Sequence, residues 1–201
     1  MRAFYQAISY LFHPLFIPLA GTVAYFTVTP KYSPATLQTH IFLPVLILTV
    51  IIPVIAFFIL KNIGIVSSAL TPSMEERKYP LYIHIILLLI VVYKVIPGQY
   101  TFELHYYFIG LIASALTTLL LLFLRVKASM HVMGLGSLFM FLVCLSIHFE
   151  INITLAVSVL TLITGLVATS RLYLRAHSKV EVFVGFLVGL LSQLMLVKFW
   201  L

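Results

Sequence analysis

Seven long apolar segments, separated by short polar ones, constrain this sequence more than any other feature. They lie at about residues 8–28, 41–60, 81–96, 104–124, 132–149, 151–169 and 180–201. A helix of about 20 predominantly apolar residues crosses the hydrocarbon core of a bilayer. Because 63% of the residues are hydrophobic, a soluble domain of this size could not bury its apolar surface. The sequence therefore predicts an all-α, polytopic transmembrane helix bundle of six to seven spans, forming a single domain over residues 1–201.

The charged residues are few and predominantly basic. The formal net charge is +7, and the five acidic residues are all glutamate. In a membrane protein this balance indicates loops that rest on anionic lipid head groups, and nucleic acid is a poor second choice because the basic residues are scattered. The single Cys144 lies in an apolar segment, which excludes a disulfide framework and a thiolate metal site. The first residues lack a cleavage site, so we expect the first segment to be retained as a span.

Three polar segments follow the second, fourth and sixth apolar segments. They cover residues 75–80, 125–131 and 170–181. With seven spans, all three lie on the side of the membrane that carries the N-terminus. The sequence therefore predicts that they converge into one site at one membrane interface. We expect a turn at Pro97-Gly98 on the opposite side.

The third polar segment has the densest chemistry, reading S-R-L-Y-L-R-A-H-S-K-V-E from Ser170 to Glu181. His177 and Glu181 have the i, i+4 spacing, so on a helix they share a face and the carboxylate can orient the imidazole. Arg171 could hold an anion in front of that imidazole with its planar set of donors. A nucleophilic histidine with an orienting carboxylate and an anion clamp suits phosphoryl transfer.

These residues resemble the motifs of the membrane-bound type 2 phosphatidic acid phosphatase family, which also includes the vanadium haloperoxidases. The third family motif is S-R, five residues, H, three residues, D, and here it reads Ser170-Arg171, His177 and Glu181 at the same spacing. The second motif, P-S-G-H, corresponds to residues 128–131, A-S-M-H. The first motif survives loosely in residues 77–80, R-K-Y-P. The resemblance covers about residues 75–189.

The resemblance implies a role for each matched residue. His177 would attack phosphorus and form a phosphohistidine, Glu181 would be its partner, and His131 would be the general acid and base. The phosphate oxygens would be held by Arg171, Ser129 and either Arg77 or Lys78, with Lys127 and Ser170 as further candidates. No metal or other cofactor is expected, because fixed cations stabilise the charge and the chain offers no carboxylate cage. The substrate would be a lipid phosphate or pyrophosphate in the bilayer, which for such a protein is expected to be the bacterial inner membrane.

Among the departures from the family pattern, two bear on the chemistry. Glu181 is one methylene longer than the family's aspartate, so we expect the imidazole to shift or the helix to start differently. Met130 replaces a glycine and is expected to narrow the approach to the phosphate. A catalytically degenerate protein that binds lipid phosphates or acts as a scaffold is therefore the alternative function. A small transporter is the third choice, because the only ionisable residue near a span centre is His84.

The remaining histidines are interpreted as structural. His13 would be a polar group at the interface, and His84, His105 and His148 lack the close-spaced pairs of a membrane metal site. Orientation stays open: nine of the 12 basic residues lie on the motif side, which favours the cytoplasm, but many members of the family act on the outer face of the inner membrane.

Overall fold

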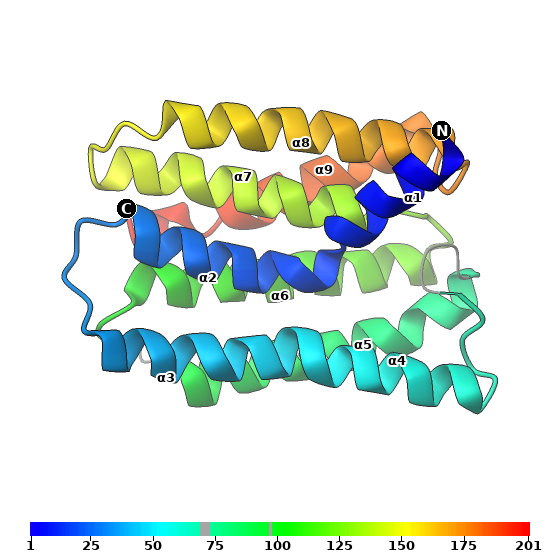
Figure 1. The fold of residues 1–201 in the computed structure, drawn as a ribbon, viewed down its shortest axis with the longest axis horizontal. Coiled ribbons are helices and arrows are strands. Elements are labelled where there is room, and N and C mark those ends of the chain that lie inside the picture. The colour runs from blue at the N-terminus through cyan, green and yellow to red at the C-terminus, as the bar shows by residue number, and fades with distance from the viewer. Residues whose placement is uncertain (69–72, 97) are drawn as a thin grey trace.

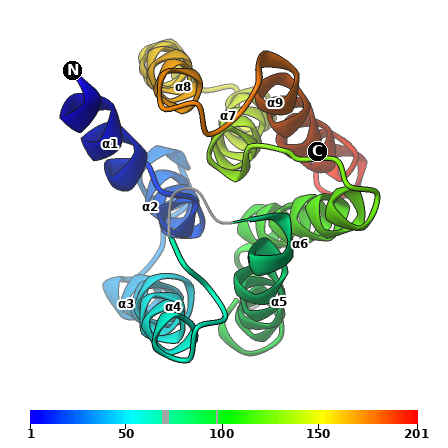
Figure 2. The same ribbon diagram turned by 90° about the vertical axis from the view of Figure 1, so that its right-hand side faces the viewer.

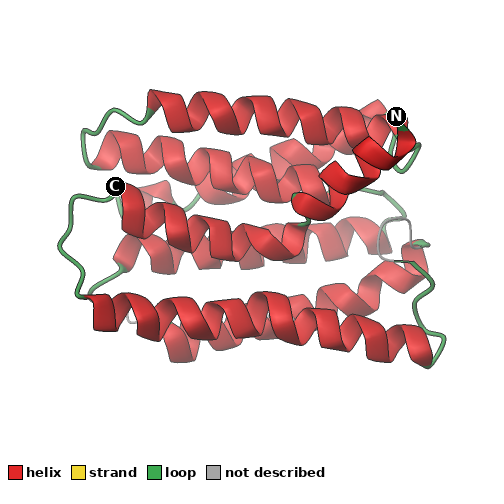
Figure 3. Ribbon diagram, in the orientation of Figure 1, coloured by secondary structure: helices red, strands yellow, loops and turns green. Residues whose placement is uncertain are grey.

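The computed structural model describes residues 1–68, 73–96 and 98–201, which form helices and loops with no β-strand (Figure 3). Seven helical segments are long and apolar enough to cross a membrane: Arg2–Val28, Ala35–Asn62, Met74–Val95, Phe102–Phe123, Met130–His148, Thr154–Tyr173 and Lys179–Phe199. The prediction of an all-α membrane protein is therefore confirmed. Residues 69–72, between the second and third spans, and the proline of the predicted Pro97-Gly98 turn lie outside the described residues.

The first span is a broken helix rather than a continuous one. Helix α1 (Arg2–Leu11) ends before His13-Pro14, a 3₁₀ turn covers Pro14–Phe16, and α2 (Ile17–Val28) continues the span. Proline has no backbone N–H and disfavours helical geometry in the residue before it, so the break occurs where the sequence places Pro14. The helical segment begins at Arg2, six residues before the expected start. The break turns α1 at an angle to α2 (Figure 2), and α1 packs against α8.

The second and third spans each contain a π-helical segment. In the second, Ile47–Ile51 joins α3 (Ala35–Leu46) to α4 (Ile52–Asn62). Pro53 follows that segment and cannot donate a backbone hydrogen bond to the preceding turn, which favours the wider winding. In the third span, α5 (Met74–Ile90) continues into a π-helical segment at Val91–Val95.

The last four spans are single helices. They are α6 (Phe102–Phe123), α7 (Met130–His148), α8 (Thr154–Tyr173) and α9 (Lys179–Leu194), which a short 3₁₀ turn at Val197–Phe199 follows. Figure 1 shows the N-terminus and the loops after α4, α6 and α8 at one end of the bundle, with the C-terminus at the other. The three polar segments therefore lie at the same end, as their positions after the second, fourth and sixth spans predict.

Helix α7 is the most buried span, and it packs most extensively against α9. Glycine makes that approach possible. A Cβ atom on Gly189 would lie 2.0 Å from the backbone oxygen of Met133, and one on Gly185 would lie 2.6 Å from that of Ser129. Small residues let two helix backbones come close in a membrane protein. The seam between α7 and α9 thus fixes Ser129 and the start of α7 against the start of α9.

A buried carboxylate, that of Glu103, lies at the end of the bundle opposite the three polar segments. Glu103 accepts hydrogen bonds from the hydroxyl of Tyr25, at 3.0 Å, and from Lys31, and His148 Nε2 lies 3.4 Å from it. These residues belong to α2, the loop after it, α6 and α7. Since a buried charge must be paired, the cluster holds these segments together at the end far from the three polar segments.

Candidate active site

A cavity of about 580 Å³ opens between the broken first span, α4, α5, α7 and the loop between α8 and α9. Four histidines and two arginines contribute to its wall: His13, Arg77, His84, His131, Arg171 and His177. Lys61, Ser67 and Ser68 line it where the chain leaves α4. Residues from all three polar segments thus meet in one cavity, although up to 100 positions separate them in the sequence.

His177 is held by Glu181 in a local structure that differs from the expected one. His177 lies in the loop before α9, and its Nδ1 is 2.8 Å from Glu181 Oε2. Glu181 is the third residue of α9, where it also forms a capping box: Ser178 N–H donates to its carboxylate, and its own N–H donates to the Ser178 hydroxyl. The contact therefore depends on a helix cap and not on two residues sharing a helix face.

The capping box accounts for glutamate at position 181. In a capping box the third helical residue must reach back to the N-cap N–H, and glutamate or glutamine has the length to do so. The same carboxylate then holds His177 Nδ1. The S-x-x-E pattern of residues 178–181 is visible in the sequence and indicates this geometry. In this structure the longer side chain of Glu181 belongs to a helix that begins at Lys179, with Glu181 as its third residue.

Burial and charge keep His177 neutral. Its side chain is almost fully buried, and burial lowers the pKa of His177 below the usual range for histidine. The guanidinium of Arg77 lowers that pKa further, whereas the hydrogen bond with Glu181 acts in the opposite direction. With Nδ1–H donated to the carboxylate, the lone pair of the neutral ring is on Nε2. That is the form of imidazole that can act as a nucleophile.

His131 occupies the second position of α7 with one ring nitrogen already engaged. Its Nε2 lies 3.0 Å from the backbone oxygen of Ser9 in α1. A carbonyl oxygen only accepts, so Nε2 carries the hydrogen and Nδ1 is the nitrogen that can gain or lose a proton. The ring of His13 packs edge-on against His131, with 5.1 Å between centroids. A group that exchanges one proton at Nδ1 fits the role of acid and base.

Arg171 is the largest fully buried side chain, with 1% of its surface exposed. Its Nη1 donates to the Ser9 hydroxyl at 3.2 Å, and that hydroxyl is 2.8 Å from Ser170 Oγ. Ser170 Oγ also donates to the backbone oxygen of Tyr5 at 2.7 Å. Helix α1 thus fixes both residues of the S-R pair. Arg171 reaches the cavity, whereas Ser170 is used to bind α8 to α1.

The first polar segment contributes Arg77, while Lys78 lies elsewhere. Arg77 is buried and lines the cavity. Lys78 pairs with Glu75, with 2.6 Å between Nζ and the carboxylate, and lies over the ring of Phe123. Of the two basic residues that the first motif left open, the structure brings Arg77 to the other candidate residues.

Ser129 and Lys127 do not line the cavity. The backbone N–H of Ser129 donates to the backbone oxygen of Glu181 at 3.0 Å, which ties the start of α7 to α9. Its hydroxyl is buried and has no hydrogen-bond partner among the described residues. Lys127 lies half-exposed in the preceding loop. Met130, which stands where the resemblance expects glycine, does line the cavity.

The cavity contains two histidines that the sequence analysis assigned to the site, His131 and His177, and two that it did not. His13 and His84, interpreted as structural, both line the cavity. The position of His84 near the centre of a span was a signal, because ionisable side chains in a membrane usually face a polar interior. Over residues 1–68, 73–96 and 98–201, no group of three or more histidine, cysteine or carboxylate side chains is arranged to hold a metal ion.

Comparisons of the chain with family models, with curated proteins and with solved structures give no match. The likeness to the phosphatase family thus consists of the motif residues and their spacing.

Proposed function

We propose that the protein hydrolyses a lipid phosphate or pyrophosphate without a metal ion, through a phosphohistidine at His177. The observation that carries this proposal is the meeting of His177, His131, Arg77 and Arg171 in one cavity. These residues come from three polar segments that are far apart in the sequence. Together they supply the groups that phosphoryl transfer needs: a nucleophile, an acid–base group and two fixed cations.

In the first step, Nε2 of His177 attacks phosphorus while the bond between phosphorus and the alcohol oxygen breaks. Arg77 and Arg171 stabilise the negative charge of the phosphoryl oxygens. His131 enters this step with a hydrogen on both ring nitrogens, and the leaving alcohol oxygen takes the one on Nδ1. Glu181 stabilises the positive charge that develops on the His177 ring.

In the second step, water attacks the phosphohistidine. His131, now neutral, accepts the water proton at Nδ1. The phosphorus–nitrogen bond breaks, inorganic phosphate leaves, and Nε2 of His177 regains its lone pair. The Ser9 carbonyl retains the Nε2 hydrogen of His131 throughout, so one nitrogen alone carries the exchanging proton.

The cavity wall supports a lipid rather than a soluble phosphate ester as the substrate. Beside the polar residues lie apolar side chains of α4, including Val54, Phe57 and Phe58. Phe57 is half-buried and Phe58 is exposed on a membrane-spanning helix. An apolar chain can therefore lie beside α4 while its phosphate reaches the arginines.

A binding-only protein of the same fold is the second candidate. The observation in its favour concerns Ser129, whose N–H is already bonded to Glu181 and whose hydroxyl is outside the cavity wall. One group that the resemblance assigns to the phosphate is therefore not presented to it.

Phosphate release in detergent, measured with EDTA present, tests both candidates. The substrates would be phosphatidate, phosphatidylglycerophosphate and a polyprenyl diphosphate. We expect release by the wild type and by Lys127→Ala, and none by His177→Ala. Vanadate binding by a folded protein that releases no phosphate from any of the lipids would instead support the binding-only function.

A further inference from the structure

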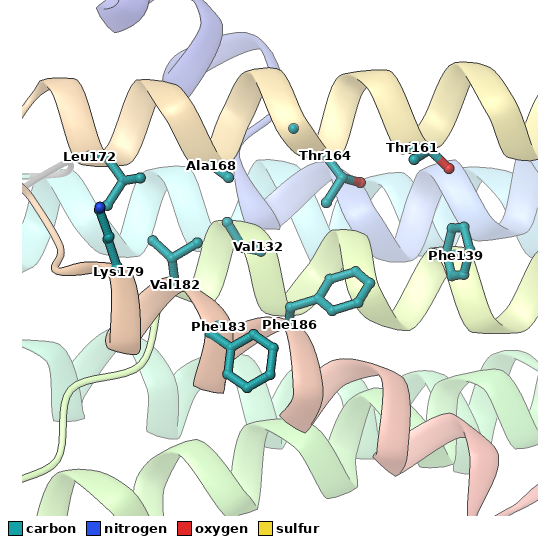
Figure 4. A pocket seen from close by; sticks show the side chains of 11 residues that line it. Val132, Phe139, Thr161, Thr164, Ala168, Leu172, Lys179, Val182, Phe183 and Phe186 are labelled. Carbon is teal, nitrogen blue, oxygen red and sulfur yellow. The ribbon is translucent and has the colours of Figure 1, made fainter.

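A second hollow lies on the opposite side of α7 and α8 from the cavity. It is a groove of about 410 Å³ whose floor is α7 and whose walls are α8 and α9 (Figure 4). Val132 and Phe139 of α7 line it, with Gly165 and Ala168 of α8 and Phe183 and Phe186 of α9 among the wall residues. All three helices are membrane spans, so the groove faces the bilayer.

The two threonines that line the groove do not make it polar. Its two threonines, Thr161 and Thr164, donate their hydroxyls to backbone oxygens of their own helix at 2.8 Å. Gly165 leaves it open, because a Cβ atom there would meet nothing within 4 Å. With the hydroxyls satisfied, Lys179 is the one lining side chain of this groove, as the structure describes it, that offers a hydrogen-bonding group to a ligand in the bilayer.

Its length matches one leaflet. The lining residues of α8 run from Thr161 to Leu172, which at the helical rise corresponds to about 16 Å. Half of the hydrocarbon core of a bilayer is about 15 Å. The groove therefore extends from the interface on the cavity side to about the middle of the membrane.

One cation stands at the interface end. Lys179 lines the groove beside Leu172, and Figure 4 shows its amine directed toward Leu172. Lys179 is the first residue of α9, where a positive charge is unfavourable because the helix dipole is positive at its N-terminus. Helix stability therefore does not account for a lysine at this position. An anionic group at the membrane surface would.

We propose that this groove binds an anionic phospholipid from the cavity-side leaflet, with one acyl chain between α8 and α9 and its phosphate at Lys179. The lipid would lie directly behind the candidate active site. Val132, Leu172 and Val182 of the groove each follow a site residue in the chain, namely His131, Arg171 and Glu181. A bound chain thus packs against the backbone that positions those three side chains. This inference concerns binding alone and stands independently of the proposed function.

Native mass spectrometry of the detergent-purified protein with equal amounts of phosphatidylglycerol and phosphatidylethanolamine tests the proposal. We expect one retained lipid with phosphatidylglycerol preferred. Gly165→Leu fills the groove and should reduce retention by about tenfold or more, because buried methylene contacts are lost. Gly165→Ala, which adds helix propensity with little volume, and Ala156→Leu, on an exposed position of α8 outside the groove, should both retain it.

The headgroup contact has its own pair of variants. Lys179→Ala should abolish the preference for phosphatidylglycerol, whereas Arg175→Ala, an exposed cation outside the groove, should leave it unchanged. Equal retention by Gly165→Leu and Gly165→Ala, or no preference in the wild type, would overturn the proposal.

Photocrosslinking tests the proposed lipid groove in the wild-type protein, without any variant. Phosphatidylglycerol with a diazirine near the end of one chain should label the midplane end of the groove, at Phe139 and Thr161. Labelling spread over the exposed faces of all the spans would show a general lipid shell and contradict a defined site.

Discussion

At the scale of single residues, a serine outside all three motifs connects the groups of the cavity. Ser9 is fully buried in α1, its hydroxyl contacts Arg171 and Ser170, and its backbone oxygen accepts from His131. Nothing in the sequence near Ser9 indicates this role. The contacts join residues more than 120 positions apart, and they depend on how α1 leaves the bundle at His13-Pro14.

We predict that Ser9→Ala weakens anion binding without unfolding the protein. The change removes the hydroxyl that orients Arg171 but leaves the backbone oxygen that holds His131. A hydrogen bond to a charged group contributes about 1.5–3 kcal/mol, so vanadate affinity should fall by about tenfold or more. Thr27→Ala, which removes an exposed hydroxyl bonded to its own helix, is the matched control. Equal vanadate affinity in the two variants would contradict a positioning role for Ser9.

The choice of glutamate at position 181 gives a second prediction. Glu181→Asp introduces the family's residue, but the shorter side chain cannot reach both Ser178 N–H and His177 Nδ1. We expect a loss of about 1 kcal/mol of unfolding free energy, the usual effect of a lost cap, together with slower phosphate release. Glu181→Gln keeps the length, so it should unfold like the wild type while phosphate release falls. If Glu181→Asp unfolds at the same temperature as the wild type, the capping box does not contribute to stability.

His177 also predicts a pH dependence of stability. Burial lowers its pKa in the folded protein, so below the ordinary histidine value of 6.5 the unfolded chain binds a proton that folded His177 does not. The contribution of His177 to unfolding free energy is therefore constant at alkaline pH and declines as the pH falls through 6.5. Unfolding temperatures measured from about pH 8 to about pH 5 should fall less in His177→Gln than in the wild type. Identical slopes would mean that His177 titrates normally in the folded state.

At the scale of elements, the seam between α7 and α9 sets the geometry of the site. It holds the start of α7, with His131, against the start of α9, with Glu181. The backbone hydrogen bond from Ser129 to Glu181 is the direct link. Gly185 and Gly189 permit this close approach of the two helices, since a Cβ atom at either would overlap backbone atoms of Ser129 or Met133.

We predict that Gly189→Ala destabilises the protein by about 1–3 kcal/mol, as overpacking of a tight interior does. The added Cβ would lie 2.0 Å from the backbone oxygen of Met133, and a backbone atom cannot move aside alone. Gly165→Ala is the matched control, because its Cβ meets nothing within 4 Å and alanine is the better helix former. Thermal unfolding of both variants measures the difference. Equal unfolding temperatures would show that the two helices can separate without loss.

The helices were predictable from the sequence to the extent that hydropathy determines them. All seven spans were predicted, and the parity of the polar segments placed their loops at one end. The break at His13-Pro14 was visible as a proline signal, but its consequence was not. The bend in the first span lets α1 contact Arg171 and His131. These contacts depend on the packing of helices that are far apart in the sequence.

The sequence could predict those contacts of the candidate site that are local in the chain, and not those between distant segments. His177 and Glu181 are four residues apart, so their contact follows from the chain itself. His13 and His84 line the cavity and Ser9 contacts Arg171 and His131, but none of the three belongs to a motif, so motif spacing cannot place them. Lys78 and Arg77 are adjacent, and only the direction of α5 decides which of them faces the cavity.

At the scale of the whole molecule, polar chemistry is concentrated at the two ends of the bundle. The cavity with its four histidines and two arginines lies at the end of the N-terminus, and the Glu103 cluster lies at the other. The apolar spans between them match a bilayer. The spans therefore indicate an integral membrane protein, and the cavity lies near one end of them.

An odd number of spans predicts that the two termini lie on opposite sides of the membrane. Reporter fusions at each end, active on one side only, would measure this, with a fusion in the loop at residues 29–34 as the control for the C-terminal side. We expect the N-terminal reporter to match the loops that carry the three polar segments. Reporters on the same side would mean that one of the seven helices does not cross the bilayer.

The most direct test of the proposed chemistry is capture of the phosphorylated histidine. Wild-type protein would be mixed with lipid carrying radiolabelled phosphate, quenched in alkali and analysed for acid-labile label. We predict label on His177, none in His177→Ala, and both slower formation and slower loss of label in His131→Asn, which lacks the acid of the first step and the base of the second. Phosphate release with no label on His177, or label that persists in His177→Ala, would contradict a histidine nucleophile at this site.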